Sequence, residues 1–315
     1  MAQTETGREL DPVNKRVSTA LAKLQAVSLE RVARSVRFRA MNMLARFEPV
    51  RAITAFGAGT PREDIRSPIF PGASARQLST DLKRDGIAFG LTLPPAVLEE
   101  IQAWAKATPR YGNICKEWGY HDGDRAAAEA KAGSHFTVGH YFNTSDCPAV
   151  QRLVDDPLLA ELARSYVGPR AKYISTHMWW SYANDVPEAD RNAYAQQFHF
   201  DLDDYRFMKF FFYLTDVDLD SGPHTYMRGT HTAKKMKDLF PMRRFTDREV
   251  HDQWGKEREV KVTGPAGSGF IVDTFGIHKG TPPRTRDRLV IELEWGQRYY
   301  GFGNDVVPAG ELALL

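Results

Sequence analysis

The spacing of hydrophobic positions changes part-way along this chain. Up to Gly168 they recur at helical intervals, and after Lys172 they alternate with polar positions. Recurrence every three to four residues predicts amphipathic helices, here over 93–106 and over 150–167 with an interruption at Asp156. Alternation predicts short strands, the clearest of which span 173–182, 207–214 and 289–295. The pattern predicts a mainly β fold with helices packed on one side of its sheets.

The first 60 residues differ from the rest in charge. Hydrophobic residues recur at helical intervals over 13–47, where arginines are frequent, and the glycine- and proline-rich stretch 57–74 predicts a linker or surface loop. We expect two regions, a basic helical N-terminal extension at 1–60 and one domain at 61–315. A basic amphipathic helix either packs its apolar face on the domain or makes peripheral contact with an anionic membrane.

Composition narrows the class of protein. The 315 residues have an ordinary apolar fraction and a net charge of +2, which by itself argues neither for nor against nucleic acid. No apolar run approaches the ~20 residues that span a bilayer, and the polar N-terminus lacks a signal-peptide core. The two cysteines make no disulfide framework. We expect a cytoplasmic protein with no transmembrane segment and no nucleic-acid partner, and the oligomeric state stays open.

Two histidines and one carboxylate in the strand region are candidate metal ligands. His199 and Asp201 are two residues apart, so on an extended strand both side chains point to the same face. His278 follows after a gap long enough for several strands to return to the same place. Two histidines and a carboxylate are the ligand set of non-haem Fe(II) oxygenases, which leave positions open for substrate and O2. Arg288 offers the planar cationic fork that a carboxylate cosubstrate needs.

Alternation along 288–295 predicts which arginine faces this metal. One face of the strand is apolar, and the other carries Arg288, Val290, Glu292 and Glu294. If helices cover the apolar face, Arg288 turns inward. Arg284 and Arg286 lie in the turn after two prolines, where we expect them in solvent.

The order of these motifs resembles that of the phytanoyl-CoA dioxygenase family over about residues 75–297. The resemblance is carried by His199-x-Asp201, Ser221-Gly222-Pro223-His224, Arg228-Gly229-Thr230-His231, His278-x-Gly280 and Arg288. It implies a double-stranded β-helix, a cupin-like jelly roll, with His199, Asp201 and His278 as catalytic iron ligands and Arg288 as the 2-oxoglutarate anchor. It also implies an Fe(II)/2-oxoglutarate-dependent dioxygenase that uses O2 and releases succinate and CO2.

The resemblance implies a reaction type but no particular substrate. Asp201 favours hydroxylation of an unactivated C–H bond, because related halogenases have a small residue at that position. We expect a small or medium organic metabolite as substrate, with other oxidations of the same C–H bond left open. One alternative is a JmjC-like oxygenase acting on a protein or a sugar-lipid, which a basic N-terminal helix would suit. Another is a non-catalytic scaffold that has kept the metal ligands.

Four further residues are candidates for contacts with the small molecules. Tyr213 is a candidate hydrogen-bond donor to 2-oxoglutarate. His177 and Trp180, on the aromatic strand 173–182, are candidate substrate contacts, although they point to opposite faces and the sequence does not say which is inside. Tyr205, just past the ligand segment, is a third. We expect the nearby His224 and His231 to orient loops rather than to bind the metal.

Overall fold

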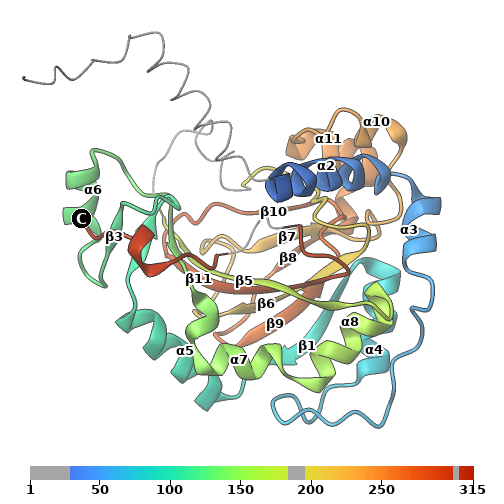
Figure 1. Ribbon diagram of the computed structural model, residues 1–315, viewed down its shortest axis with the longest axis horizontal. Helices are drawn as coiled ribbons and strands as arrows, with labels where there is room; N and C mark the ends of the chain where they lie inside the picture. Colours follow the sequence, from blue (N-terminus) through green and yellow to red (C-terminus); the bar gives the residue numbers. More distant parts are fainter. Residues whose placement is uncertain (1–28, 184–195, 301–304) are drawn as a thin grey trace, which may run out of the picture.

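The computed structural model describes residues 29–183, 196–300 and 305–315, and within them two antiparallel sheets (Figure 1). The larger sheet has the strand order β1-β9-β6-β11-β5-β4-β2-β3, and the smaller has the order β10-β7-β8. The strands of the larger sheet are β1 Ile87–Thr92, β2 Arg110–Gly112, β3 Gly119–Tyr120, β4 Val138–Tyr141, β5 Lys172–Ser181, β6 Phe207–Tyr213, β9 Ser268–Val272 and β11 Arg288–Gly296. Those of the smaller are β7 His224–Met227, β8 Glu259–Val262 and β10 His278–Gly280.

Helices cover the outer face of the larger sheet. These are α4 Ala75–Asp85, α5 Pro95–Ala107, α7 Pro148–Val154 and α8 Pro157–Val167. The remaining helices of the described chain are α2 Leu29–Leu44, α3 Glu48–Thr54, α6 Arg125–Ala132, α10 Met236–Leu239 and α11 Asp247–Trp254, with 3-10 turns at Thr144–Asp146, Lys256–Arg258 and Ala309–Glu311. The predicted interruption between α7 and α8 is confirmed, because the Asp156 carboxylate accepts the N–H groups of Leu158 and Leu159 and so caps α8.

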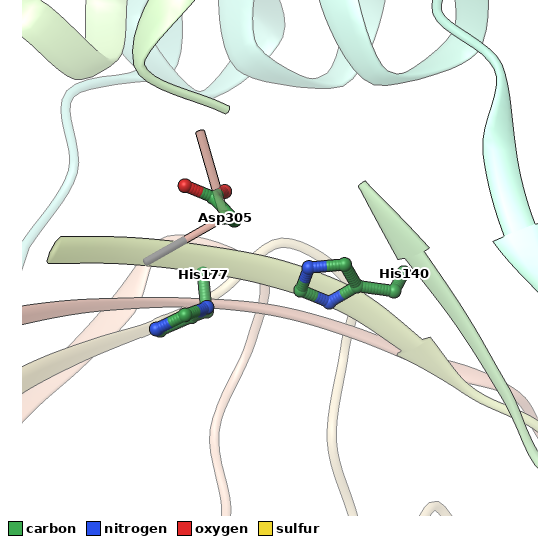
Figure 2. Close-up of side chains that lie close together, drawn as sticks. All are labelled: His140, His177 and Asp305. Carbon is green, nitrogen blue, oxygen red and sulfur yellow. The ribbon is translucent and has the colours of Figure 1, made fainter. Parts of the chain in front are cut away.

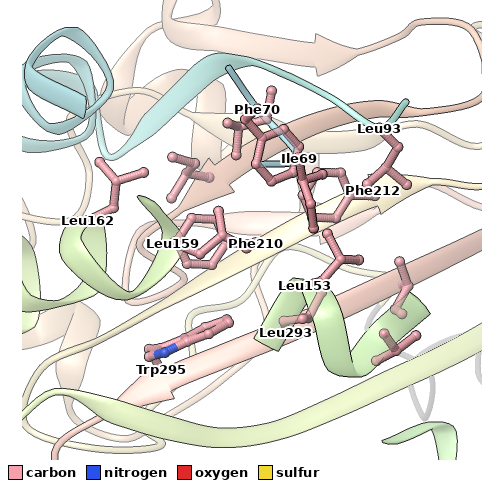
Figure 3. Packing of buried hydrophobic residues seen from close by; sticks show 14 of the residues in the cluster. Ile69, Phe70, Leu93, Leu153, Leu159, Leu162, Phe210, Phe212, Leu293 and Trp295 are labelled. Atoms are coloured by element: carbon pink, nitrogen blue, oxygen red, sulfur yellow. The ribbon is translucent and has the colours of Figure 1, made fainter. Parts of the chain in front are cut away.

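The main hydrophobic core lies between these helices and the larger sheet (Figure 3). Leu159 and Leu162 of α8 pack with Phe210 of β6 and Leu293 of β11, all at most 1% exposed. Burying each such side chain contributes about 1.5–3 kcal/mol. The apolar face of β11 therefore points to the helices, as its alternation predicts, and Arg288 points the other way.

The inner face of the larger sheet packs on the smaller sheet. Phe211, Phe270 and Val290 of the larger sheet share a hydrophobic cluster with Tyr226 and Val262 of the smaller one. Two antiparallel sheets packed face to face, with helices outside one of them, form the predicted double-stranded β-helix. The fold class is confirmed.

The segment that carries His199 and Asp201 is extended but does not form the strand that we predicted. It makes single bridges, Phe198 to Phe245 and His199 to His278, and the Asp201 N–H donates to the Thr274 carbonyl at 2.8 Å. The alternation still holds, since Phe198 is fully buried in a core cluster while His199 turns to the other side.

Helices α2 and α3 are packed on the domain. Met41 of α2 is 1% exposed and lies in one hydrophobic cluster with Phe200 and Phe275 of the domain. Arg51 of α3 is also buried, 3.6 Å from the Asp273 carboxylate. The described part of the extension predicted at 1–60 therefore packs on the domain, and the first part of the predicted helix lies outside the described residues. Within the part that the structure describes, no helix is long and apolar enough to cross a bilayer.

Replacing Met41 by alanine should test this docking. The substitution leaves a cavity in a closed cluster and should cost about 2–5 kcal/mol of unfolding free energy, measured by urea denaturation. Met43→Ala is the matched control, because Met43 is on the same helix and 51% exposed, and should change stability by less than about 0.5 kcal/mol. Equal effects of the two substitutions would show that α2 does not pack as described.

Candidate active site

His199, Asp201 and His278 converge between the two sheets. The His199 Nε2 and His278 Nε2 atoms lie 3.6 and 3.8 Å from the two carboxylate oxygens of Asp201. One ligand atom from each of the three residues falls within 4.8 Å of the other two. Ligands of one ion at about 2.1 Å lie about 3.0–3.4 Å apart, so small side-chain rotations close this set around a metal.

Backbone contacts fix the two histidines in the form that binds metal. The His199 Nδ1–H donates to the Gln197 carbonyl at 2.8 Å, and the His278 Nδ1–H donates to the Gly276 carbonyl at 3.0 Å. Each Nε2 therefore carries the free lone pair. The backbone groups of His199 and His278 also exchange two hydrogen bonds of 2.9 Å, which hold the imidazoles side by side. The donor set and its tautomers fit a divalent metal such as Fe(II).

The protonation states agree with metal binding. Burial, with a smaller contribution from His278, lowers the pKa of His199 to about 3, and burial also lowers the pKa of His278. Both rings are therefore neutral near pH 7. Burial by itself would raise the pKa of Asp201, but Lys209 and the two histidines outweigh it, and the pKa lies below its usual range. The carboxylate is ionised.

A cavity of about 250 Å³ opens beside these three residues. We call it the metal cavity, and it is lined by the three candidate ligands with Trp179, Ser181, Gln196, Lys209, Phe211, Tyr213, His224, Phe270, Gly280, Arg288, Val290 and Glu292. Its walls come from β5, β6, β9 and β11 of the larger sheet and from β7 and β10 of the smaller. The inward faces of both sheets thus share one space.

Arg288 faces the metal cavity, as predicted. It is 5% exposed, its Nη2 donates to the Ser181 hydroxyl at 3.0 Å, and its Nε has no hydrogen-bond partner among the described residues. Burial lowers the pKa of this guanidinium. Arg284 and Arg286 have side chains 79% and 60% exposed, beside Asp220 and Asp218, so they lie in solvent as expected. A buried cation with unused donors is suited to an anionic ligand.

Tyr213 lines the metal cavity, but its hydroxyl is engaged. It donates to the Val262 carbonyl at 2.8 Å and accepts the His224 N–H at 2.9 Å. These bonds join β6 of the larger sheet to β7 and β8 of the smaller one. To donate to 2-oxoglutarate, as predicted, Tyr213 would have to leave the Val262 carbonyl.

The three candidate substrate residues have different outcomes. His177 points to the inner side and lines a second cavity. The prediction that Trp180 contacts substrate is wrong, because Trp180 faces the helices and its indole N–H donates to the Tyr141 hydroxyl at 3.1 Å. Its neighbour Trp179 is the tryptophan that lines the metal cavity. The structure also does not support a substrate contact by Tyr205, since Tyr205 lines neither cavity and packs against the hydrophobic cluster that contains Met41 of α2.

The second cavity has a volume of about 270 Å³ and adjoins the first. We call it the acidic cavity, and it is lined by Phe38, Ile174, His177, Asp201, Asp203, Lys209, Glu292, Glu294, Arg298 and Tyr300. It shares Asp201, Lys209 and Glu292 with the metal cavity. Phe38 brings helix α2 to its wall, 5.7 Å from the Tyr300 ring.

Lys209 is the functional candidate that our sequence analysis did not single out. Its Nζ lies 3.1 Å from Asp201, 3.0 Å from Asp203 and 3.3 Å from Glu292. Burial by itself would lower the pKa of Lys209, but these carboxylates raise it well above its usual value. The signal for it was present, since Lys209 alternates in phase with Phe211 and Tyr213. Lys209 holds Asp201 in its ionised form and in its place.

Comparison of the sequence with models of protein families shows to which family the chain belongs. The model of the family described as Phytanoyl-CoA dioxygenase (PhyH) matches residues 85–289, which include the three candidate ligands and Arg288. The chain belongs to the phytanoyl-CoA dioxygenase family. Membership confirms the expected class, an iron- and 2-oxoglutarate-dependent oxygenase, with iron as its cofactor and 2-oxoglutarate and O2 as its cosubstrates.

Individual relatives of this family member are distant. No curated protein matches the chain. Among solved structures, the SnoN non-heme alpha ketoglutarate dependent epimerase from nogalamycin biosynthesis is 14% identical, with a TM-score of 0.47 over 75% of this chain and 90% of SnoN. HygX from Streptomyces hygroscopicus, with nickel and 2-oxoglutarate bound, is 15% identical, with a TM-score of 0.48 over 74% of this chain and 90% of HygX. At such distances no activity transfers.

Proposed function

We propose that His199, Asp201 and His278 bind Fe(II), that Arg288 binds 2-oxoglutarate, and that the enzyme hydroxylates a C–H bond of a small or medium organic substrate. One observation carries this proposal. The three ligand atoms and a buried guanidinium with unused donors share one cavity. An oxygenase that uses iron, O2 and 2-oxoglutarate needs this combination, because the metal must keep open coordination positions and a site for an anion must lie near it.

Each residue has a defined task in this proposal. The two Nε2 lone pairs and the Asp201 carboxylate hold the metal, which activates O2 when it is bound. Arg288 holds the distal carboxylate of 2-oxoglutarate through its fork, and Ser181 orients that fork from β5. Trp179, Phe211 and Phe270 wall off the space around the metal from bulk water.

The substrate occupies the acidic cavity and extends toward the metal. Burial, then repulsion by Asp203, raises the pKa of Glu294 well above its usual value, and burial raises that of Glu292. One lysine is shared among Asp201, Asp203 and Glu292. A long apolar chain would leave these buried polar groups without partners, so we propose a substrate with hydroxyl or amine groups.

The residues that line the cavities also argue against the two alternative functions, an oxygenase with a protein or sugar-lipid target and a non-catalytic scaffold. Phe38 of α2 lines the acidic cavity, so a protein or sugar-lipid target would approach past a packed helix, which favours a small substrate. A non-catalytic scaffold needs the three metal ligands but has no use for a buried guanidinium beside them. Conversion of 2-oxoglutarate to succinate separates the catalyst from the scaffold.

Asp201→Gly should abolish hydroxylation, by at least about a hundredfold, because it removes the anionic ligand and opens a further coordination position. The measurement is substrate-stimulated succinate release together with iron content. Asp203→Gly is the matched control, since Asp203 contacts the same Lys209 at 3.0 Å but does not belong to the ligand set. It should keep the iron. Wild-type hydroxylation by Asp201→Gly would exclude Asp201 as a ligand.

A further inference from the structure

We propose a second divalent-metal site, of the zinc class, formed by His140, His177 and Asp305. Their ligand atoms all lie within 4.8 Å of one another, and the group shares no residue with the iron ligands. Figure 2 shows the three side chains close together, with His140 on one strand, His177 on the strand beside it and Asp305 on a separate segment. Its assignment does not use the iron ligands, although His177 also lines the acidic cavity.

The sheet brings the two histidines together. β4 pairs with β5 so that His140 lies opposite Trp179, and His177 is two residues from Trp179 on the same inward face. Their ring centroids are 5.9 Å apart. Diagonal neighbours on one face of an antiparallel pair can contact a shared partner.

The C-terminal segment supplies the carboxylate. The Asp305 carbonyl accepts the Asn143 N–H at 3.0 Å. The Asn143 side chain then donates to the Val307 carbonyl at 2.9 Å and accepts the Val307 N–H at 2.8 Å. Asn143, two residues after the end of β4, thus holds this segment with its backbone and side chain and places Asp305 near His140.

Two of these side chains are buried, and neither has an ion-pair partner among the residues that the structure describes. His140 is 6% exposed, and its ring packs against the rings of Phe142 and His177 at centroid distances of 4.9 and 5.9 Å. Asp305 is 2% exposed, and its carboxylate accepts hydrogen bonds from Thr144, through the N–H at 3.3 Å and through the side chain. A buried imidazole and carboxylate that face each other without bonding are costly unless something lies between them. A divalent cation would satisfy both.

The donor set favours a borderline transition metal. Two imidazoles and one carboxylate suit Zn²⁺ and its neighbours, whereas Ca²⁺ and Mg²⁺ prefer oxygen ligands alone. Burial keeps the His140 ring neutral, since it lowers the pKa of that ring to about 3. The ion would tie the C-terminal segment to β4 and β5, beside the acidic cavity that His177 lines.

Metal stoichiometry in five forms of the full chain tests the proposal. With Co²⁺ supplied in excess to metal-free protein, wild type should bind two ions per chain. His140→Gln and His199→Ala should each bind one, and the double variant none. His135→Gln is the control for a histidine outside both groups, as its side chain is 86% exposed, and should bind two.

The His199→Ala variant keeps the test decisive even if changes at His140 or Asp305 impair folding. It retains the whole proposed second site, so its remaining Co²⁺ should give visible ligand-field absorbance, displaced by one equivalent of Zn²⁺. A wild-type stoichiometry of one, with none left in His199→Ala, would overturn the second site. Asp305→Asn should weaken Zn²⁺ binding at least tenfold in the His199→Ala background, and an unchanged affinity would remove Asp305 from the ligands.

Discussion

His278→Ala should lose turnover by at least about a thousandfold, which corresponds to about 4 kcal/mol of activation free energy. The reaction has no route without the metal, and the substitution removes one of three protein ligands. The fold should persist, because the backbone hydrogen bonds between His278 and His199 do not need the imidazole. Iron content by atomic absorption and succinate release by mass spectrometry measure the two effects, with circular dichroism as the check on folding.

His251→Ala is the matched control for this loss. His251 lies on α11, pairs with Glu259 at 2.7 Å and lines neither cavity. It should keep both the iron and the activity. If His278→Ala bound iron at the wild-type stoichiometry, the metal would have to sit elsewhere, and the assignment of the ligand set would be wrong.

Arg288→Ala should weaken 2-oxoglutarate binding by at least about a hundredfold. Removing the partner of a desolvated carboxylate typically costs about 2–5 kcal/mol, a factor of roughly 30 to several thousand. Arg288→Lys should be intermediate, because lysine offers a point charge and no fork. Iron binding should persist in both variants, since Arg288 is not in the ligand set. Titration of the Fe(II) charge-transfer absorbance with 2-oxoglutarate, without oxygen, gives the affinities.

Two arginines in the turn before β11 provide the controls. Arg284→Ala and Arg286→Ala remove the same charge from exposed side chains, so neither should change the affinity by more than about threefold. If one of them carried the loss and Arg288 did not, the 2-oxoglutarate site would lie at the rim of the barrel rather than in the metal cavity.

The inward direction of Arg288 and the shared face of His199 and Asp201 follow from the sequence, because both depend on local alternation. Along β11 every second residue is apolar, which settles that Arg288 and Glu292 point away from the helices. His199 and Asp201 share a face for the same reason, even though their segment forms single bridges rather than a strand.

Alternation gives two faces but not which of them is inside. On β5 alternation places Trp179 and Trp180 on opposite faces, so each face carries an aromatic residue and the composition does not distinguish them. The choice depends on Tyr141 of β4, whose hydroxyl accepts the Trp180 indole N–H on the helix side. Such a contact follows from strand pairing, which a single sequence does not reveal.

Clusters assembled from distant segments are the hardest to predict. His140 lies on a strand of four residues, and Asp305 lies in a segment without regular structure. Only the pairing of β4 with β5 and the clamp at Asn143 bring them together. Lys209 is an intermediate case, since its inward direction follows from alternation, but its carboxylate partners come from two other parts of the chain.

Succinate formation from 2-oxoglutarate by the iron-loaded chain tests the central claim most directly. Without added substrate, wild type should form several equivalents of succinate per chain, and formation should require both Fe(II) and O2. Pools of hydroxyl- and amine-bearing metabolites should raise the rate. Succinate at no more than the His278→Ala level, with every pool, would contradict the assignment of a catalytic iron centre and would leave a metal-binding scaffold.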